Sequence, residues 1–362
     1  MRIFIFLIVF SGVALSWSYA ITLLIVYTFL PFSDFLSILL FLSSLGAMSF
    51  LIGTIWSHTH PHRVFALLYK YWSIWLWALT IAGLVALAFL MVAIFTGIVY
   101  IHPLHLSFYA LLVFWLNVHG LWNSTHPKIR EYSIDIHTPH AWHGKKIILV
   151  SDMHYGNIYT SEDAKKLVDT INTLSWEIVL IPGDLFDGPE IDYVWVAREF
   201  ERIQAPYGVI FTNGNHEEYS NTLWILKAIE GAGITILNDK KIILGGMIFA
   251  WVSYHDTETP LGLTRVLDGL SLDPDMPIIL LKHKPTLHTI LSGYPIDLVV
   301  SGHTHRGQMW PFALITDLIY GKYVYGLSVD GNTSSITTSG VGTWWPPQRL
   351  GTQSEIVVIT IR

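Results

Sequence analysis

A near absence of charge in the first third of the chain is the feature that most limits how this protein can fold. Residues 1–127 of the 362 contain only four charged side chains, Arg2, Asp34, Arg63 and Lys70. The residues that follow carry nearly all of the acidic and basic groups, and the whole chain has a formal net charge of −6. This division predicts a membrane-embedded part followed by a water-soluble part.

Four apolar segments in the first part are candidates to cross a bilayer. A helix needs about 20 apolar residues to span the hydrocarbon core. Three segments reach that length, whereas the fourth is shorter and contains His105, Asn117 and His119. The segments are residues 3–30, 35–56, 72–101 and 104–121. We therefore predict an N-terminal all-α transmembrane bundle of about four helices within residues 1–122.

The distribution of Lys and Arg predicts the orientation of these segments. Basic residues occur before the first segment, between the second and third, and after the fourth: Arg2, then Arg63 and Lys70, then Lys128 and Arg130. The other two connections contain neither Lys nor Arg. Because cytoplasmic loops are enriched in basic residues, we expect a multi-pass protein of the cell membrane whose soluble part is cytoplasmic. An odd number of crossings, for instance without the fourth segment, would export the soluble part instead.

Short apolar runs bounded by polar residues or glycine occur throughout the soluble part. Such runs are typical of buried strands in parallel sheets. Five of them are residues 147–150, 178–181, 209–211, 278–281 and 298–300. Helical patterns alternate with them; one helix is expected to begin after Thr160 as its N-cap and to run through Leu174. Gly245-Gly246 and Asp330-Gly331 indicate turns of β-hairpins. The pattern predicts an α/β domain.

Each of the five runs is followed by residues of types that bind metals. Ligand sites of open α/β sheets form beyond the carboxyl ends of the strands. The fragments are, in chain order, Asp152-Met153-His154, Gly183-Asp184, Gly214-Asn215-His216-Glu217, His283 and Gly302-His303-Thr304-His305. Taken singly, Asp152-Met153-His154 is a common surface pattern, Gly183-Asp184 is more often a turn and His283 is more often a core histidine, whereas Gly302-His303-Thr304-His305 is a stronger signal. Five such fragments in this order, each directly after a predicted strand, predict a two-metal centre.

This ordered series resembles the signature of the calcineurin-like metallophosphoesterases. The similarity extends over the residues from about Lys145 to Arg362. It implies that residues 145–362 form a four-layer α/β/β/α sandwich of two mixed sheets covered by helices. Residues 123–144, with two prolines and four histidines, are then expected to link this domain to the transmembrane helical region.

The carboxyl-terminal part resembles a bacterial membrane-associated branch of this superfamily. The residues that carry this similarity are Gly340-Val341-Gly342-Thr343-Trp344, Arg349 and Gln308. That branch commonly has glycine where this chain has Arg306, so the pocket beside the ligands is expected to differ. Arg306 could bind substrate phosphate through bidentate hydrogen bonds, or it could form a surface salt bridge.

The resemblance implies two divalent metal ions that share one carboxylate. One ion would take Asp152, His154, Asp184 and His305, and the other would take Asp184, Asn215, His283 and His303. Asp184 would bridge them, because a carboxylate offers two anionic oxygens. Ligands of these types accept Mn, Fe, Zn or Co, so the sequence does not choose the metal.

His216 lies outside both implied coordination spheres. The resemblance implies that it faces the leaving-group oxygen as a general acid or a stabiliser of the transition state, and histidine can donate a proton near neutral pH. Glu217 could orient its ring or form a structural ion pair. Asp187 could support the site or simply belong to a turn. The implied nucleophile is a metal-bridging hydroxide, without a phosphoenzyme.

The sequence thus predicts a membrane-anchored hydrolase of a phosphomonoester, phosphodiester or pyrophosphate. Anchoring favours a lipid-linked substrate, although a soluble phosphodiester fits the same residues. A different class is a non-catalytic membrane sensor or transporter that binds a phosphorylated ligand through metals; retention of His216 beside every ligand disfavours it. The chain lacks cysteine, which excludes disulfides and thiolate ligands. The acidic soluble part offers no basic patch for nucleic acid. The expected partners are therefore the bilayer and a phosphorylated small molecule or lipid.

Overall fold

The computed structural model describes residues 44–46, 48, 49, 52, 56, 63–97, 103–136, 141–187, 193–219 and 222–362. The first predicted span and most of the second lie outside these residues, so the four-helix bundle stays a prediction. The chain divides into two compact units, which are described separately. One contains residues 1–122 and Trp345–Gln348, and the other contains residues 123–344 and 349–362.

The helical unit contains two long apolar helices among its described residues, α3 (Arg63–Thr96) and α4 (Pro103–Thr125). Both are long and apolar enough to cross a membrane, judged by length and composition. The Tyr109 hydroxyl of α4 donates a hydrogen bond of 3.1 Å to the carbonyl of Ala82 in α3, and Ala86 and Tyr109 are buried together. Small residues allow apolar helices to approach closely. The third and fourth predicted spans overlap α3 and α4, but α3 begins at Arg63 and so includes Arg63 and Lys70, which were expected in the connection before it.

The second unit is an α/β domain built on two six-stranded mixed sheets. The first has the order β1 (Lys128–Ile134), β14 (Glu355–Ile361), β2 (Lys146–Leu149), β4 (Ile178–Ile181), β6 (Val209–Phe211) and β7 (Thr235–Ile236). The second has the order β12 (Gly326–Asp330), β13 (Thr333–Thr337), β11 (Leu298–Ser301), β10 (Ile278–Leu281), β9 (Met247–Trp251) and β8 (Lys241–Leu244). Antiparallel pairing is confined to β14 with β2, β8 with β9, and β12 with β13, so the centre of each sheet is largely parallel.

The central strands are buried on both faces, which explains their uniformly apolar sequences. In β10, Ile279 and Leu281 belong to one buried cluster with residues of both sheets, such as Leu149 and Leu180 of the first sheet. The alternate residues of β10, Ile278 and Leu280, point to the other face, where they pack against a helix. The two-residue period of a strand thus divides one apolar run between two cores.

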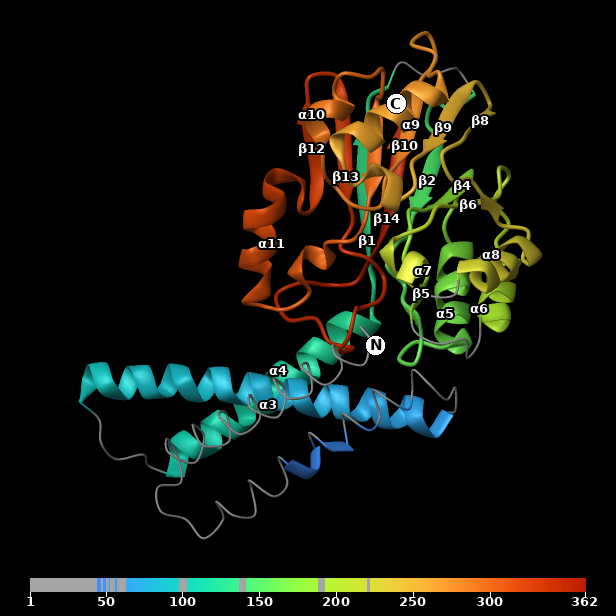
Figure 1. Ribbon diagram of the computed structural model, residues 1–362. Helices are drawn as coiled ribbons and strands as arrows, with labels where there is room; N and C mark the ends of the chain where they lie inside the picture. The colour runs from blue at the N-terminus through green and yellow to red at the C-terminus, as the bar shows by residue number, and fades with distance from the viewer. Residues whose placement is uncertain are drawn as a thin grey trace. The chain divides into compact units, whose positions relative to one another are not determined.

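Helices pack against the sheets, as Figure 1 shows. Those that follow the strands of the first sheet are α5 (Ser161–Asn172), α6 (Tyr193–Phe200), α7 (Asn215–Tyr219) and α8 (Thr222–Gly231). Those of the second half are α9 (Pro260–Leu270), α10 (His288–Leu291) and α11 (Phe312–Tyr320). The predicted start of α5 is confirmed, because Thr160 forms a capping box with Asp163. Leu263 and Leu267 of α9 close the core on the outer face of β10.

Residues 123–144, expected to be a linker, contain a strand of the domain. All seven residues of β1 pair in parallel with β14, from Lys128 opposite Glu355 to Ile134 opposite Ile361. Trp142 is also buried and stacks on Tyr207. The sequence of β1, Lys-Ile-Arg-Glu-Tyr-Ser-Ile, is mostly charged or polar, and the strand lies at the sheet edge with most of its side chains exposed. The composition of β1 therefore gives no apolar run from which a strand could be predicted.

Candidate metal centre

The residues predicted to bind metals lie where β2, β4, β6, β10 and β11 end. Their nitrogen and oxygen atoms form three groups in which all donors lie within 4.8 Å of one another. The groups are Asp152, His154 and His305; His154, Asp184 and His216; and Asp184, His283 and His303. Five loops separated by as many as 150 residues thus meet at one rim of the two sheets.

The first group brings two imidazoles and one carboxylate together, and Asp184 adds a second carboxylate beside it. The Nε2 atoms of His154 and His305 are 3.0 Å apart, and His305 Nε2 is 3.4 Å from Asp152 Oδ1. His154 Nε2 is also 3.9 Å from Asp184 Oδ2. All four residues are buried, so their polar atoms face one another rather than bulk solvent.

The third group contains the same aspartate, and Asn215 lies beside it. His283 Nε2 is 3.2 Å from Asp184 Oδ2 and 3.2 Å from Asn215 Oδ1. His303 Nδ1 is 2.9 Å from Asn215 Oδ1 and 3.3 Å from His283 Nε2. Asp184 Oδ2 therefore faces both groups of donors.

These separations fit the coordination of divalent ions. Ligands at about 2.1 Å from a metal lie roughly 3 Å from one another, which is the spacing of most donor pairs here. Carboxylate and amide oxygens with imidazole nitrogens suit several first-row metals. The Nδ1 of His283 donates to the carbonyl of Pro182 at 2.7 Å, which leaves the Nε2 lone pair directed at the group. The residues present could therefore hold metal ions.

The charges in the group favour a bound cation. Burial alone would raise the pKa of Asp184, but His283, His216 and His154 together outweigh burial and hold that pKa well below its usual value. Burial opposes a charge on His283, yet the Asp184 carboxylate raises the pKa of His283 to about 9. Burial lowers the pKa of His154 to about 4 and that of His303 to about 3, with neighbouring imidazoles adding to the effect. A metal ion would displace the proton from His283 and meet neutral imidazoles around it.

The backbone of these loops adopts conformations that side chains other than glycine rarely take. Positive φ angles between 46° and 70° occur at Asp152, His154, Asp184, His303 and His305. Such residues cost roughly 1–3 kcal/mol each and persist where neighbours enforce them. Here the His303 amide donates to both carboxylate oxygens of Asp152, at 3.0 and 3.1 Å. Strained backbone at residues with donor side chains is typical of functional sites.

His216 has a carboxylate partner, and it is Asp187. The Nδ1 of His216 lies 3.0 Å from Asp187 Oδ1. Burial opposes a charge on His216, but the hydrogen bond and charge of Asp187 raise the pKa of His216 to about 10. The sequence left open whether Asp187 supports the site or simply belongs to a turn. Its contact with His216 places it at the site. In the sequence, the feature that connects Asp187 with the site is its position three residues after Asp184.

Glu217 serves the backbone rather than the ring of His216. Its buried carboxylate accepts hydrogen bonds from the amides of Asp184 and Gly214, at 3.0 and 2.8 Å, and of Phe186, at 3.0 Å. These amides belong to the turns after β4 and β6. The hypothesis that Glu217 orients His216 is thus corrected: this carboxylate fixes the loops that carry Asp184 and Asn215.

Arg349 is fully buried beside the first group. Its guanidinium donates to the carbonyls of Ser339 and Gly342, at 2.6 and 2.5 Å, and to that of His305 at 3.4 Å. It thereby joins the loop after β13 to the loop that carries the donor residue His305. In the sequence, only the resemblance to the bacterial branch singles out Arg349. Arg306 lies differently, exposed with its guanidinium 4.3 Å from the Tyr325 ring centroid. Its predicted contact with phosphate stays a prediction.

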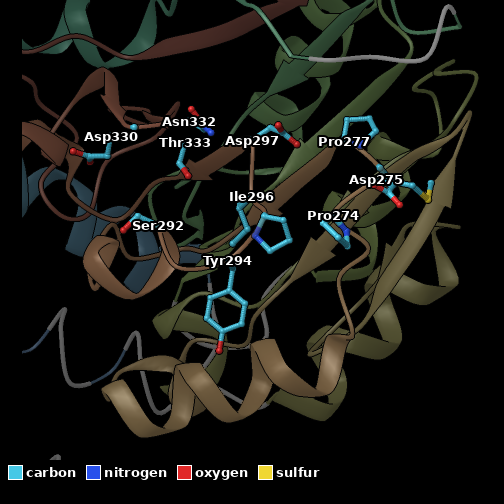
Figure 2. A pocket seen from close by; sticks show the side chains of 13 residues that line it. Pro274, Asp275, Pro277, Ser292, Tyr294, Ile296, Asp297, Asp330, Asn332 and Thr333 are labelled. Carbon is cyan, nitrogen blue, oxygen red and sulfur yellow. The ribbon is translucent and has the colours of Figure 1, made fainter.

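A cavity of about 550 Å³ lies elsewhere in the domain (Figure 2). It is lined by residues before β10, before β11 and between β12 and β13, including Asp275, Asp297 and Asp330. It therefore opens at the amino ends of β10 and β11, whereas the metal-type donors follow their carboxyl ends. Ligands of α/β sheets bind beyond carboxyl ends, so we place the chemistry at the donor groups.

Comparison with known proteins agrees with this geometry. The calcineurin-like phosphoesterase family matches residues 145–307, which contain all the donors described above. A metallophosphoesterase of Helicobacter pylori is 31% identical over 265 residues, which cover 71% of this chain and 70% of that protein. The chain belongs to the calcineurin-like phosphoesterases. The family assignment confirms the resemblance and indicates a metal-dependent phosphoesterase domain.

Other metallophosphoesterases share parts of this chain. A Bacillus subtilis metallophosphoesterase is 30% identical over 62% of this chain and 81% of its own length. A zebrafish (Danio rerio) protein named transmembrane protein with metallophosphoesterase domain is 27% identical over 68% of this chain and 60% of its own length. Together with the apolar helices α3 and α4, the latter name suggests that this metallophosphoesterase is associated with a membrane.

Proposed function

We propose that this metallophosphoesterase is a membrane-anchored two-metal hydrolase of phosphomonoesters, phosphodiesters or pyrophosphates. The observation that carries the proposal is the position of Asp184, whose Oδ2 lies 3.2 Å from His283 Nε2 and 3.9 Å from His154 Nε2. A single carboxylate thus faces two groups of donors, which is the arrangement that a pair of bridged ions requires.

Seven side chains would hold the two ions. One ion would be held by Asp152, His154, Asp184 and His305, and the other by Asp184, Asn215, His283 and His303. When bound, the ions would supply Lewis acidity for the phosphoryl oxygens and would acidify the attacking water. Asn215 is neutral, so this donor set contains only two negative charges and leaves the site attractive to an anionic substrate. Mn, Fe, Zn and Co all remain compatible with these ligands.

His216 would protonate the leaving group. Its ring is fixed because Asp187 engages Nδ1 at 3.0 Å, which leaves Nε2 as the nitrogen that can face a substrate oxygen. The carboxylate also favours the protonated ring, which is the form that an acid catalyst must have before it donates. Asp187 is therefore proposed as the residue that positions His216.

The proposal includes the membrane part. We infer about four spans, a cytoplasmic catalytic domain and a substrate at the bilayer surface, such as a lipid-linked phosphate. Support comes from the basic residues that flank the apolar segments and from the length and composition of α3 and α4. The proposed domain is a four-layer sandwich in which the two mixed sheets are covered by helices. We propose residues 1–122 as the membrane region and residues 145–362 as the catalytic region, to whose first sheet residues 128–134 add the edge strand β1.

The direct test is hydrolysis by the purified full-length protein with added manganese. The panel contains p-nitrophenyl phosphoesters, cyclic nucleotides and lipid diphosphates, and the Asp184→Asn variant serves as the control for contaminating hydrolases. Turnover of at least one class by the wild type, absent in the variant, would support the proposal. Metal-dependent binding of these phosphates with no turnover of any class would favour the non-catalytic sensor or transporter instead.

A further inference from the structure

Helix α11 presents large apolar side chains to solvent. None of its nine residues is buried, and Leu318 is 87% exposed. The other exposed apolar residues of the helix are Phe312, Leu314, Ile315 and Ile319. Figure 1 shows α11 at the outside of the domain, beside the sheet that contains β12 and β13. An exposed apolar surface of this kind usually marks an interaction site.

The side of α11 that faces the domain carries the smaller and more polar residues. Ala313, Thr316 and Tyr320 are half-buried and follow the helical spacing of a single face. A Cβ atom at Gly307 would collide with the backbone of Ala313, so the helix packs closely against the loop that contains His305. A helix at the surface of a soluble domain has the opposite arrangement, with its large apolar residues turned to the core. Asp317 is the one charged residue of α11.

A bilayer is the surface that fits this helix. The first strand of the domain, β1, begins at Lys128, three residues after α4 ends at Thr125. A connection of that length spans at most about 11 Å, so an α4 embedded in a membrane keeps the domain at the membrane surface. Aromatic residues also flank α11, with Trp310 before it and Tyr323 after it. Trp and Tyr are enriched where proteins meet the headgroup region.

We propose that α11 inserts its exposed apolar face into the surface of the bilayer that anchors the chain. The helix is joined to the metal centre at both ends. It begins five residues after Gly307, and the ring of Tyr320 at its end lies 6.1 Å from the ring of His303. Insertion of α11 therefore brings the donor groups to within about the length of this helix, roughly 14 Å, of the headgroups. The contact of α11 with the bilayer is separate from the membrane spans. It can be measured without catalytic turnover.

The chain contains no cysteine, so single labels can be introduced into the full-length protein. Leu318→Cys is the test variant. Leu261→Cys is the matched control, because Leu261 is also an apolar helix residue and is 81% exposed. Each variant receives an environment-sensitive fluorophore and is reconstituted into nanodiscs of phosphatidylcholine and phosphatidylglycerol. Quenching is then measured with nitroxide-labelled lipids and, separately, with a water-soluble quencher.

The proposal predicts that the label at residue 318 is quenched at least severalfold more strongly by the lipid nitroxides than the label at residue 261. It also predicts protection of residue 318 from the aqueous quencher. Equal responses at the two positions would overturn it. Protection of residue 318 without lipid quenching would also overturn it, and would assign the surface to a second copy of the chain. Protection in native membranes but not in nanodiscs would equally overturn it, and would assign the surface to a protein partner.

Discussion

At the scale of single residues, the site depends on how each histidine is held. His283 donates from Nδ1 to a backbone carbonyl and so directs Nε2 to the donor groups, whereas His216 is engaged at Nδ1 by Asp187. Two histidines that look alike in the sequence thus have different surroundings. In the proposed mechanism the first binds a metal ion and the second acts as the acid.

His216→Ala should retain the metals but lose turnover in a way that depends on the leaving group. General acid catalysis contributes about 10²–10⁴-fold, so a loss of that order is expected for an alkyl phosphoester. A p-nitrophenyl ester needs little protonation, and its rate should fall much less. Steady-state kinetics on both substrates, with elemental analysis of the protein, checks this prediction. His143→Ala, at an exposed position, is the control.

An equal loss on both substrates would instead argue that His216 stabilises the phosphoryl oxygens. Loss of metal in the variant would make it a ligand and would refute the assignment of the two donor groups.

Asp187→Asn should shift the pH dependence of the reaction. Asp187 raises the pKa of His216, and an acid catalyst is active below its pKa, so activity is expected to decline as the pH rises through that value. Removing the carboxylate lowers the pKa, and the alkaline limb of the kcat/KM profile should therefore move to lower pH. A lower rate with an unmoved limb would indicate that Asp187 only supports the local structure.

At the scale of secondary structure, the loops after the strands are held by buried polar side chains. The Glu217 carboxylate accepts three backbone hydrogen bonds from the segments after β4 and β6, and Arg349 joins the loop after β11 to the loop after β13. The backbone at several donors has strained, positive φ angles. The hydrogen bonds of Glu217 and Arg349 help to hold the loops in this conformation.

Glu217→Ala should destabilise the domain strongly. Each buried amide left without an acceptor costs about 1–3 kcal/mol, so the free energy of unfolding is expected to fall by roughly 3 kcal/mol or more. Thermal unfolding of the full-length protein in detergent measures the effect as a lower midpoint. Glu218→Ala, which removes a partly exposed neighbour, should change the midpoint far less. Comparable midpoints for both variants would show that the three hydrogen bonds contribute little.

The central strands and the donor residues could be predicted because their sequence patterns are local. Buried parallel strands need continuous apolar runs, and the runs at 178–181, 209–211 and 278–281 match the observed strands residue for residue. Strand β1 was missed because an exposed edge strand needs no apolar run. The pairing of His216 with Asp187 was missed because chain order gives neither the direction of a ring nor the path of a loop.

At the scale of the whole molecule, the charge-poor segment and the metal-type donors lie in different parts of one chain. The helical unit contains α3 and α4, together with Trp345, whose indole nitrogen donates to Ser73. Trp345 therefore packs in the helical unit rather than in the core of the domain, while Trp344 is exposed.

The proposed topology predicts where reporters will be found. A reporter fused after Arg362 should be cytoplasmic, and one inserted between His102 and Pro103 should be external, because basic residues favour the cytoplasmic side. Paired fusions to alkaline phosphatase, which is active only after export, and to a cytoplasmic fluorescent protein check both positions. An active phosphatase at the carboxyl terminus would show an odd number of spans.

The metal content of the wild type and of Asp184→Asn, measured by elemental analysis together with activity, tests the two-metal site most directly. We predict about two divalent ions per chain in the active wild type. The variant should lose one or both ions and nearly all turnover, because an amide cannot supply the bridging charge. Asp275→Asn, in the cavity at the opposite ends of the strands, should keep both. Two ions and normal activity in Asp184→Asn would contradict the account.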